Sequence, residues 1–276
     1  VEALRPGAKL VLLGDADQLA SVDAGAVFAD LVAAGHASDL VCRLDKNYRS
    51  DPDAPIGQLG PLVRAGNVKA ALELLRAGEG LRWVELDAAR PGAFKKAFAE
   101  VVRAGYAPWK AATTEAEAFQ QLDTFRVLAA HRTGPWGVST LDASVAAELA
   151  VGERRIVLIT HNDHDVKLYN GDLGVVRKTD AGVLATFGER SFGLSRLPPH
   201  ERAFVMTVHK SQGSEFDHVA VVLPDASSPL LGRELFYTAI TRAKQRVTLF
   251  ATEEAVTAAI GRQTRRVSGV GARVFG

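Results

Sequence analysis

Polar side chains gather directly after two apolar segments of this sequence. Gly14, Asp15 and Gln18 follow the apolar run 8–13, and a second polar group follows Met206. That second group consists of Thr207, His209, Lys210, Ser211, Gly213 and Glu215. Ligands of open parallel sheets bind at the carboxyl ends of strands, so both groups stand where a ligand is expected.

A glutamine and an arginine supply the chemistry that these positions suggest. Gln18 can orient a water molecule, and Arg242 carries a planar, permanently charged fork that suits a phosphate. We expect Arg242 to share one face of a helix with Leu235 and Ala239, because residues three and four apart lie on the same side. An arginine so placed can neutralise charge that develops on a transferred phosphoryl group.

Each of these residues also has an ordinary structural explanation. A Gly-Asp pair after a strand is usually a turn, Thr207 and Ser211 are of residue types that cap helices, and a lone arginine such as Arg242 often makes a surface ion pair. His209 can be a strand-end histidine bonded to backbone, since no metal-ligand spacing accompanies it. Taken singly, the residues do not decide between these alternatives.

Apolar strands alternate with amphipathic helices in the elements that must position these residues. Near-continuous apolar runs predict strands buried on both faces at 8–13, 40–44, 81–86, 125–130, 203–208, 218–223 and 246–250. Helices are predicted at 24–34, 60–66, 68–77, 93–105 and 233–244. A strand, a helix and a strand in succession form the right-handed crossover of a parallel sheet, so the predicted fold class is α/β.

Residues 154–199 follow a different pattern. The runs RIVLIT, LGVVRK, VLATFG and SFGLS are short and are separated by NGD and TDAG turns. Short strands at this spacing predict a small antiparallel β-barrel. Because α/β patterns stand on both sides of it, we interpret the barrel as an insertion.

Composition narrows the class of protein. The chain has 276 residues, 47% of them apolar, and a formal charge of +1, which excludes extensive disorder and leaves a nucleic-acid partner open. The single cysteine, Cys42, cannot form a disulfide within the chain, so we expect a reducing cytoplasm and a buried thiol. No apolar run reaches the roughly 18 to 20 residues of a membrane span, so no membrane location is expected.

The order of four segments gives these residues more weight. The segments are GDADQLASVDAGAVF (14–28), LDKNYRS (44–50), TVHKSQGSEFDHVAVVLP (207–224) and ELFYTAITRAK (234–244). In this order they resemble motifs III, IV, V and VI of superfamily 1 DNA helicases, and most closely those of the RecD family, the alpha subunits of exonuclease V. Weaker resemblance extends to 56–67, 131–141, 160–174 and 265–270, so it spans nearly the whole chain.

The resemblance implies roles for individual residues. Gln18 resembles the sensor of the terminal phosphate of ATP, Arg49 the motif IV arginine that reaches the gamma-phosphate, and Arg242 the arginine finger. Further contacts to ATP would come from Gly14, Asp15, which would hold its loop, Gly213 and Glu215. The residues that resemble DNA contacts are Thr207, His209, Lys210, Ser211, Asn162 and Asn170. The resemblance implies no metal ligand in this chain.

The resemblance also implies an architecture. Two RecA-like lobes with parallel sheets are expected, and 1–55 would be the end of the first lobe. A helical connecting segment (56–122) would lead to the second lobe (123–153 and 200–276), and an SH3-like barrel (154–199) would be inserted into that lobe.

The implied function is that of a 5′ to 3′ DNA helicase subunit. It would use ATP and Mg²⁺, act on single-stranded and duplex-end DNA beside RecB-like and RecC-like subunits, and serve double-strand-break processing and recombination. The alternatives are a stand-alone RecD-like helicase, the helicase half of a conjugative relaxase, and a non-catalytic DNA-binding scaffold.

The sequence lacks the loop that cradles nucleotide phosphates. Neither G-x-x-x-x-G-K-[ST] nor any Gly-Lys dipeptide occurs in it. Residues 1–7 have the pattern of the last turn of a helix, so we expect further residues before Val1. Those residues would carry the phosphate loop and most of the Mg²⁺ ligands.

We predict that a polypeptide of residues 1–276 alone does not hydrolyse ATP, because it lacks the phosphate-cradling loop and its lysine. The measurement is phosphate release by the purified polypeptide in the presence of ATP, Mg²⁺ and single-stranded DNA. Turnover above that of a heat-denatured sample would contradict the prediction.

Overall fold

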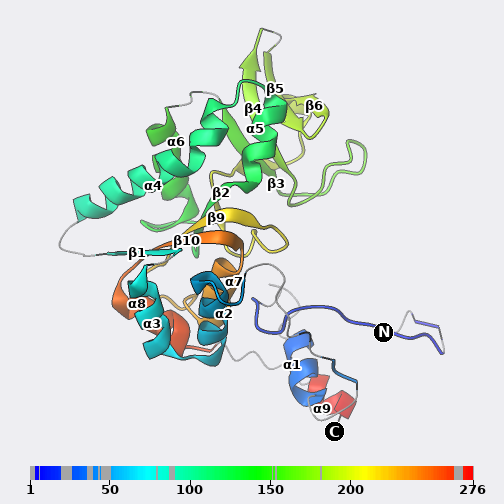
Figure 1. The fold of residues 1–276 in the computed structure, drawn as a ribbon. Helices are drawn as coiled ribbons and strands as arrows, with labels where there is room; N and C mark the ends of the chain where they lie inside the picture. The colour runs from blue at the N-terminus through cyan, green and yellow to red at the C-terminus, as the bar shows by residue number, and fades with distance from the viewer. Residues whose placement is uncertain are drawn as a thin grey trace. The chain divides into compact units, whose positions relative to one another are not determined.

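The structure is a computed structural model, and the chain divides into two compact units (Figure 1). It describes residues 4–5, 7–19, 27–35, 40–42, 44, 51–78, 80–86, 91–150, 152, 154–180, 182–263 and 270–275. The smaller unit comprises 1–46 and 264–276, and the larger unit comprises 47–263. None of the helices within these ranges combines the length and the apolarity that crossing a membrane requires.

Two helices pack together in the smaller unit. These are α1 (Val27–Ala34), which lies within the predicted helix 24–34, and α9 (Val270–Phe275). Helix α1 lies near the start of the sequence and α9 near its end, so residues from both ends of the sequence form the smaller unit.

The buried strand predicted at 8–13 is wrong. These residues form no strand, and the side chains of residues 10–13 are 54%, 77%, 52% and 87% exposed. The described part of 40–44 is likewise not in a strand, and Cys42 is exposed rather than buried. A strand takes its backbone hydrogen bonds from neighbouring strands. The described residues of the smaller unit include no strand that could provide them.

A five-stranded parallel sheet forms the centre of the larger unit. Its strands are β1 (Leu81–Glu85), β2 (Phe125–Ala129), β8 (Val205–Thr207), β9 (Phe216–Val222) and β10 (Ala243–Ala251). They lie in the order β1-β10-β9-β2-β8, and every pairing is parallel. The predicted α/β class is therefore confirmed. The strand predicted at 81–86 becomes an edge of this sheet, which makes part of the segment 56–122 a component of the sheet.

Helices cover both faces of the parallel sheet (Figure 1). On one face lie α4 (Pro91–Ala111) and α6 (Val138–Leu149). On the other lie α2 (Pro55–Ala65), α3 (Val68–Ala77), α7 (Arg233–Ile240) and α8 (Glu253–Gly261). Phe94 and Phe98 of α4 meet Phe250 of β10 with ring centroids 5.6 Å apart in each case, so aromatic packing holds α4 to the sheet.

A second sheet is inserted between α6 and β8. Its antiparallel strands are β3 (Arg155–Ile159), β4 (Leu173–Thr179), β5 (Gly182–Phe187), β6 (Arg190–Gly193) and β7 (His200–Arg202). A 3-10 turn, η3 (Leu194–Arg196), connects β6 to β7. The predicted antiparallel strands and their turns are confirmed. The order β6-β5-β4-β3-β7 ends at β6 and β7, and the described residues form no ladder between these two strands.

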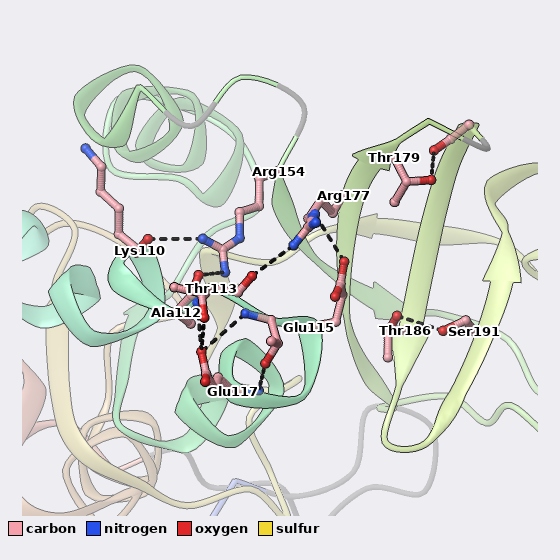
Figure 2. Close-up of polar contacts among 12 residues, drawn as sticks. Lys110, Ala112, Thr113, Glu115, Glu117, Arg154, Arg177, Thr179, Thr186 and Ser191 are labelled. Atoms are coloured by element: carbon pink, nitrogen blue, oxygen red, sulfur yellow. Dashed lines mark hydrogen bonds and ion pairs between the residues drawn. The ribbon is translucent and has the colours of Figure 1, made fainter.

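Arg154 fastens the inserted sheet to the end of α4 (Figure 2). It stands just before β3, and its guanidinium donates to the carbonyl oxygens of Lys110 and Ala112 at 3.1 and 3.0 Å. The same guanidinium lies 4.6 Å from the ring centre of Trp109. Carbonyls at the end of a helix lack partners within the helix, so Arg154 completes α4 while it holds β3 in place.

Arg177 makes the corresponding contact from β4 to the next helix, α5 (Glu115–Gln120), which a 3-10 turn, η2 (Gln121–Asp123), follows. Its guanidinium donates to the carbonyl oxygen of Thr113 at 3.1 Å and pairs with Glu115 at 3.1 Å (Figure 2). The start of α5 is itself fixed by a capping box, in which Thr114 and Glu117 bond to each other's backbone N–H. The hydrogen bond that the Thr113 backbone N–H donates to Glu117 lowers the pKa of that carboxyl. Arg154 and Arg177 therefore tie the neighbouring strands β3 and β4 to the corner between the end of α4 and the start of α5.

We predict that Arg154→Ala lowers the free energy of unfolding by about 1 to 3 kcal/mol, because two charged hydrogen bonds and the contact with Trp109 are lost. Urea unfolding followed by tryptophan fluorescence measures the change. Arg103→Ala is the matched control, since Arg103 makes only an exposed ion pair with Glu148, and it should cost less than about 1 kcal/mol. Equal losses in the two variants would contradict the prediction.

His218 of β9 lies on the face of the sheet that α4 covers. Its Nε2 is 2.9 Å from Thr248 Oγ1, and its ring is 4.9 Å from that of Phe125. Burial, together with the charges of Arg246 and Arg82, lowers the pKa of His218 to about 4. The folded chain therefore holds this imidazole neutral where an unfolded chain would protonate it.

We predict that acidification destabilises the larger unit through His218. Between pH 6.5 and pH 4 the unfolded chain takes up a proton that the folded chain excludes, so stability present above pH 6.5 is lost as the pH falls. Urea midpoints at pH 7 and pH 5 should show a loss on the order of 1 to 2 kcal/mol that is absent from His218→Gln. An identical pH dependence in the variant would exclude His218 as its source.

Candidate functional site

The candidate residues of the segments 207–215 and 242 lie at both edges of the parallel sheet. Thr207 ends β8, so His209 and Lys210 follow at the carboxyl edge. Gly213 and Glu215 precede β9, and Arg242 precedes β10, so these three lie at the amino edge. The expectation that the whole group 207–215 follows a carboxyl end is therefore wrong for Gly213 and Glu215. The connection 208–215 instead runs from one edge of the sheet to the other.

Arg242 is not part of the crossover helix. Helix α7 ends at Ile240, whereas the predicted helix extends to residue 244, so the face that Arg242 was expected to share with Leu235 and Ala239 does not exist. Thr241 ends the helix because its hydroxyl bonds back to carbonyl oxygens of the last turn, at 2.8 and 3.1 Å. Strand β10 begins at Ala243, directly after Arg242.

The Arg242 guanidinium is fixed between α7 and the segment before β9. It is 3% exposed and donates to the carbonyl oxygens of Thr238 and Ser214, at 3.2 Å in both cases. The backbone carbonyl of Arg242 in turn accepts from Phe216 N at 2.8 Å. The structure thereby joins the segments that resemble motifs V and VI, through residues that are 26 (Phe216 and Arg242) and 28 (Ser214 and Arg242) positions apart in the sequence.

Space lies open beside this arginine at Gly213. Its φ of +85° is in the left-handed region that favours glycine, and a Cβ built there would meet no atom within 4 Å. Glu215 is half-buried on the other side of Ser214. An anionic group that approached Gly213 would meet an uncovered glycine backbone one residue from Ser214, to which the buried Arg242 guanidinium is bonded. Backbone N–H groups beside an arginine suit phosphate binding.

Lys210 belongs to a charged cluster with Glu201 and Arg132. Lys210 Nζ is 2.6 Å from Glu201 Oε1, and Arg132 is 3.6 Å from the other oxygen of the same carboxylate. The three residues come from the loop after β8, from β7 and from the loop after β2. One carboxylate between two cations leaves the cluster with a net positive charge, which suits a nucleic-acid phosphate.

Thr207 and Ser211 shape the turn that carries Lys210. Thr207 Oγ1 accepts from Lys210 N at 3.2 Å, and Ser211 Oγ donates to Val208 O at 2.8 Å. Both side chains are buried, at 7% and 0% exposed, whereas His209 is half-buried. No helix directly follows β8 in the described residues 208–215, so Thr207 and Ser211 cap no helix; their hydroxyls instead hold the turn 208–213.

Three buried side chains support the chain as it enters β8. Asp142 of α6 accepts from the backbone N–H groups of Phe204 and Val205 at 3.0 and 3.3 Å and pairs with Arg202 at 3.1 Å. Tyr106 donates to the carbonyl oxygen of Phe204. Burial raises the pKa of the Asp142 carboxyl and raises that of Tyr106 to about 12.

The third of these side chains is Arg126 of β2, which is fully buried. It donates to the carbonyl oxygens of Ala203 and Leu122 and lies 5.1 Å from the ring centre of Phe216. Burial lowers the pKa of Arg126. Arg126, Tyr106 and Asp142 therefore supply hydrogen-bond partners for the buried backbone of 203–205, which sets the position of Thr207.

Asn162 and Asn170 meet in the loop between β3 and β4. Asn162 Oδ1 accepts from Asn170 N at 2.8 Å, and both side chains are exposed. The side-chain oxygen of Asn162 therefore holds the loop, and the exposed side-chain amide of Asn170 faces solvent.

Gly14, Asp15 and Gln18 form a turn in the smaller unit. Asp15 accepts from Asp17 N at 3.0 Å and from Gln18 Nε2 at 2.9 Å. A Cβ at Gly14 would stand 3.0 Å from the ring of Phe28, so glycine lets this ring pack against the turn. Arg49 lies outside the described residues. The approach of Gln18 and Arg49 to Arg242 stays a prediction.

Sequence reasoning missed Glu201, Arg132 and Asp142. Arg132 follows the strand 125–130, so the rule that polar residues after a strand mark a site could have found it. Glu201 pairs with Arg132, which lies 69 residues earlier in the sequence, and Asp142 accepts from Phe204 N, which lies 62 residues later. No local pattern distinguishes either carboxylate. Among the described residues, no group of three or more His, Cys, Asp or Glu side chains could hold a metal ion.

Comparison with known proteins gives matches over almost the whole chain. Residues 202–250 match the UvrD-like helicase C-terminal domain, and residues 1–86 match an AAA domain. The chain is 43% identical to the RecBCD enzyme subunit RecD of Mycolicibacterium smegmatis, over 99% of this chain and 50% of that protein. The resemblance to RecD is confirmed. This chain thus spans about half the length of that RecD relative.

One further relative and one solved structure are helicases by name. The chain is 31% identical to the ATP-dependent RecD2 DNA helicase of Deinococcus radiodurans, over 88% of this chain and 33% of that protein. A solved structure of the Pif1 helicase from Bacteroides, in complex with ADP-AlF3 and single-stranded DNA, covers 78% of this RecD-like chain, which in turn covers 53% of that structure. The TM-score is 0.47 and the identity 14%.

Proposed function

We propose that this chain is the C-terminal part of a RecD-like, ATP-dependent DNA helicase subunit. The subunit would translocate 5′ to 3′ within an exonuclease V complex during double-strand-break processing and recombination. The contact between Arg242 and Ser214 carries the proposal, because it joins the segments that resemble motifs V and VI. The 43% identity to a RecD subunit over 99% of the chain supports it.

ATP would bind between two RecA-like lobes, with residues 1–55 at the end of the first and 123–153 with 200–276 in the second. Gln18 and Arg49 would approach the terminal phosphate from the first lobe, and Arg242 from the second. Gly213 and Glu215 would contact the nucleotide beside Arg242, and no atom stands within 4 Å of a Cβ placed at Gly213. Gly14 and Asp15 would shape the opposite wall. Bound Mg²⁺ would neutralise phosphate charge, with its ligands mainly outside this chain.

Hydrolysis in such a site depends on position and charge. Two arginines from different lobes can stabilise the charge of the transferred phosphoryl group only when the lobes close. Loss of the terminal phosphate removes the group that both arginines bind, so the lobes open again. A cleft that closes and opens once per ATP would move DNA that lies across both lobes.

DNA would lie along the carboxyl edge of the second lobe. Lys210, in its net positive cluster with Arg132, would contact backbone phosphates, and His209 would lie beside it. Thr207 and Ser211 would act by shaping this turn. We propose that the inserted sheet is an SH3-like barrel over 154–199, which would bring Asn162 and Asn170 to the same strand of DNA.

RecB-like and RecC-like subunits would be the partners of the full protein. A stand-alone helicase is the second candidate, because the chain is also 31% identical to RecD2 of Deinococcus radiodurans. Isolation of the full-length protein from its own cells distinguishes the two. Co-purification with two larger subunits would support the first candidate, and recovery as an active monomer would support the second.

We predict that Arg242→Ala in the full-length protein lowers DNA-stimulated ATP turnover about 10³-fold or more, by analogy with other arginine fingers. ATP affinity and single-stranded DNA affinity should change little, because the lost interaction would act mainly in the transition state. Arg242→Lys keeps the charge without the planar fork, so its ATP turnover should lie between that of the wild type and that of Arg242→Ala.

Arg246→Ala is the matched control, since Arg246 lies four residues further along and makes no contact with Ser214 that the structure records. It should retain turnover. Full ATPase activity in Arg242→Ala would overturn the catalytic role. Loss of ATP affinity together with a lower unfolding midpoint would instead assign Arg242 a structural role in holding 214–216.

A further inference from the structure

An exposed aromatic pair stands in the loop between β3 and β4, the green loop that follows β3 in Figure 1. The ring centroids of His164 and Tyr169 are 5.8 Å apart, and the rings are inclined by 72°. His164 is exposed and Tyr169 is 42% exposed, although Leu168, directly before Tyr169, is fully buried. None of the roles assigned above uses either ring.

The loop that presents this pair is a tight hairpin. Asp163 N donates to Leu168 O at 2.7 Å, and Leu168 N donates to Asp163 O at 3.1 Å. Four residues therefore connect the two sides, and the last of them, Lys167, has a φ of +54°. A residue in the left-handed conformation at this position helps the chain to reverse direction before it continues to Leu168 and Tyr169.

Carboxylates of the loop bond to its own backbone. Asp163 Oδ1 accepts from Asp165 N and Val166 N at 3.0 and 3.2 Å, and Asp172 Oδ2 accepts from Tyr169 N at 2.8 Å. These hydrogen bonds fix the tip and the Tyr169 backbone. They also direct one oxygen of each of two of the three loop carboxylates towards backbone N–H groups of the loop.

Contacts from outside the loop fix it to the inserted sheet. Arg190 of β6 donates to the carbonyl oxygens of Val166 and Lys167, both at 2.9 Å. Leu168 is 0% exposed and is part of the hydrophobic core of the inserted sheet. Since Leu168 points into that core, the neighbouring Tyr169 is directed outward, beside the exposed Lys167 and Asn170.

We propose that His164 and Tyr169 form a stacking platform for bases of single-stranded DNA, and that Lys167 contacts the adjacent phosphate backbone. The inference rests on the proposed helicase function and deepens it, because it assigns base contacts to the loop that carries Asn162 and Asn170. Aromatic faces accept every base, which a protein that moves along DNA of any sequence requires. The loop is already rigid, so binding would cost little ordering entropy.

The test measures binding of the full-length protein to a fluorescent oligothymidylate at one fixed salt concentration, without nucleotide. Tyr169→Ala should weaken binding about fivefold or more, and Tyr169→Phe should stay within about twofold of wild type. An abasic oligonucleotide of the same length keeps the phosphates and lacks the bases, so wild type and Tyr169→Ala should bind it equally. Tyr169→Trp should lose fluorescence with the oligothymidylate and not with the abasic chain.

Leu230→Ala is the matched control, because Leu230 is 43% exposed and lies outside this loop. It should leave the affinity unchanged. If wild type binds and Tyr169→Ala binds equally well, the platform is overturned while the proposed function stands. A loss in Tyr169→Ala that persists with the abasic chain would also overturn it. Absence of any binding by wild type would overturn both. If Tyr169→Ala fails to fold, the Tyr169→Trp fluorescence decides.

Discussion

The passage of the chain from the inserted sheet into β8 depends on hydrogen bonds from buried side chains. Residues 203–205 are enclosed by protein, so their backbone groups cannot bond to water. Asp142, Tyr106 and Arg126, from three different elements, provide the bonds instead. Loss of one partner would leave the others buried and unsatisfied, which usually costs more than a single hydrogen bond contributes. The turn directly after β8 takes its position from this junction.

Two consequences of that junction concern the candidate site. The turn that carries Lys210 begins where β8 ends, so its place relative to β7 and β2 is set by the same buried contacts. The connection 208–215, which contains this turn, continues to Ser214, whose carbonyl oxygen accepts a hydrogen bond from Arg242. The inserted sheet is held independently by Arg154 and Arg177 at the α4–α5 corner. The loop with Tyr169 is therefore presented by a sheet that is fixed at two places.

Much of the larger unit could be predicted from the sequence. Strands 125–130 and 218–223 are continuous apolar runs, and the NGD and TDAG turns indicate antiparallel hairpins, because these patterns depend on local chemistry. The strand at 8–13 has the same apolar pattern and is not formed, since a strand also needs neighbours that local pattern does not supply. The limit of α7 was missed because the Thr241 hydroxyl competes with the helix for carbonyl oxygens. Contacts such as Lys210 with Glu201 depend on the tertiary fold alone.

The placement of β1 bears on how this chain can be divided. β1 lies at the border of the parallel sheet and pairs with β10 along its whole length, from Leu81 opposite Val247 to Glu85 opposite Ala251. A shorter polypeptide that began at residue 123 would keep the inserted sheet and four strands of the parallel sheet, but it would lack β1 and leave the nine-residue β10 with an unpaired row of amide and carbonyl groups. Such a row invites pairing with another molecule, and self-association or precipitation would follow. A piece of the larger unit that keeps β10 covered therefore has to start ahead of β1.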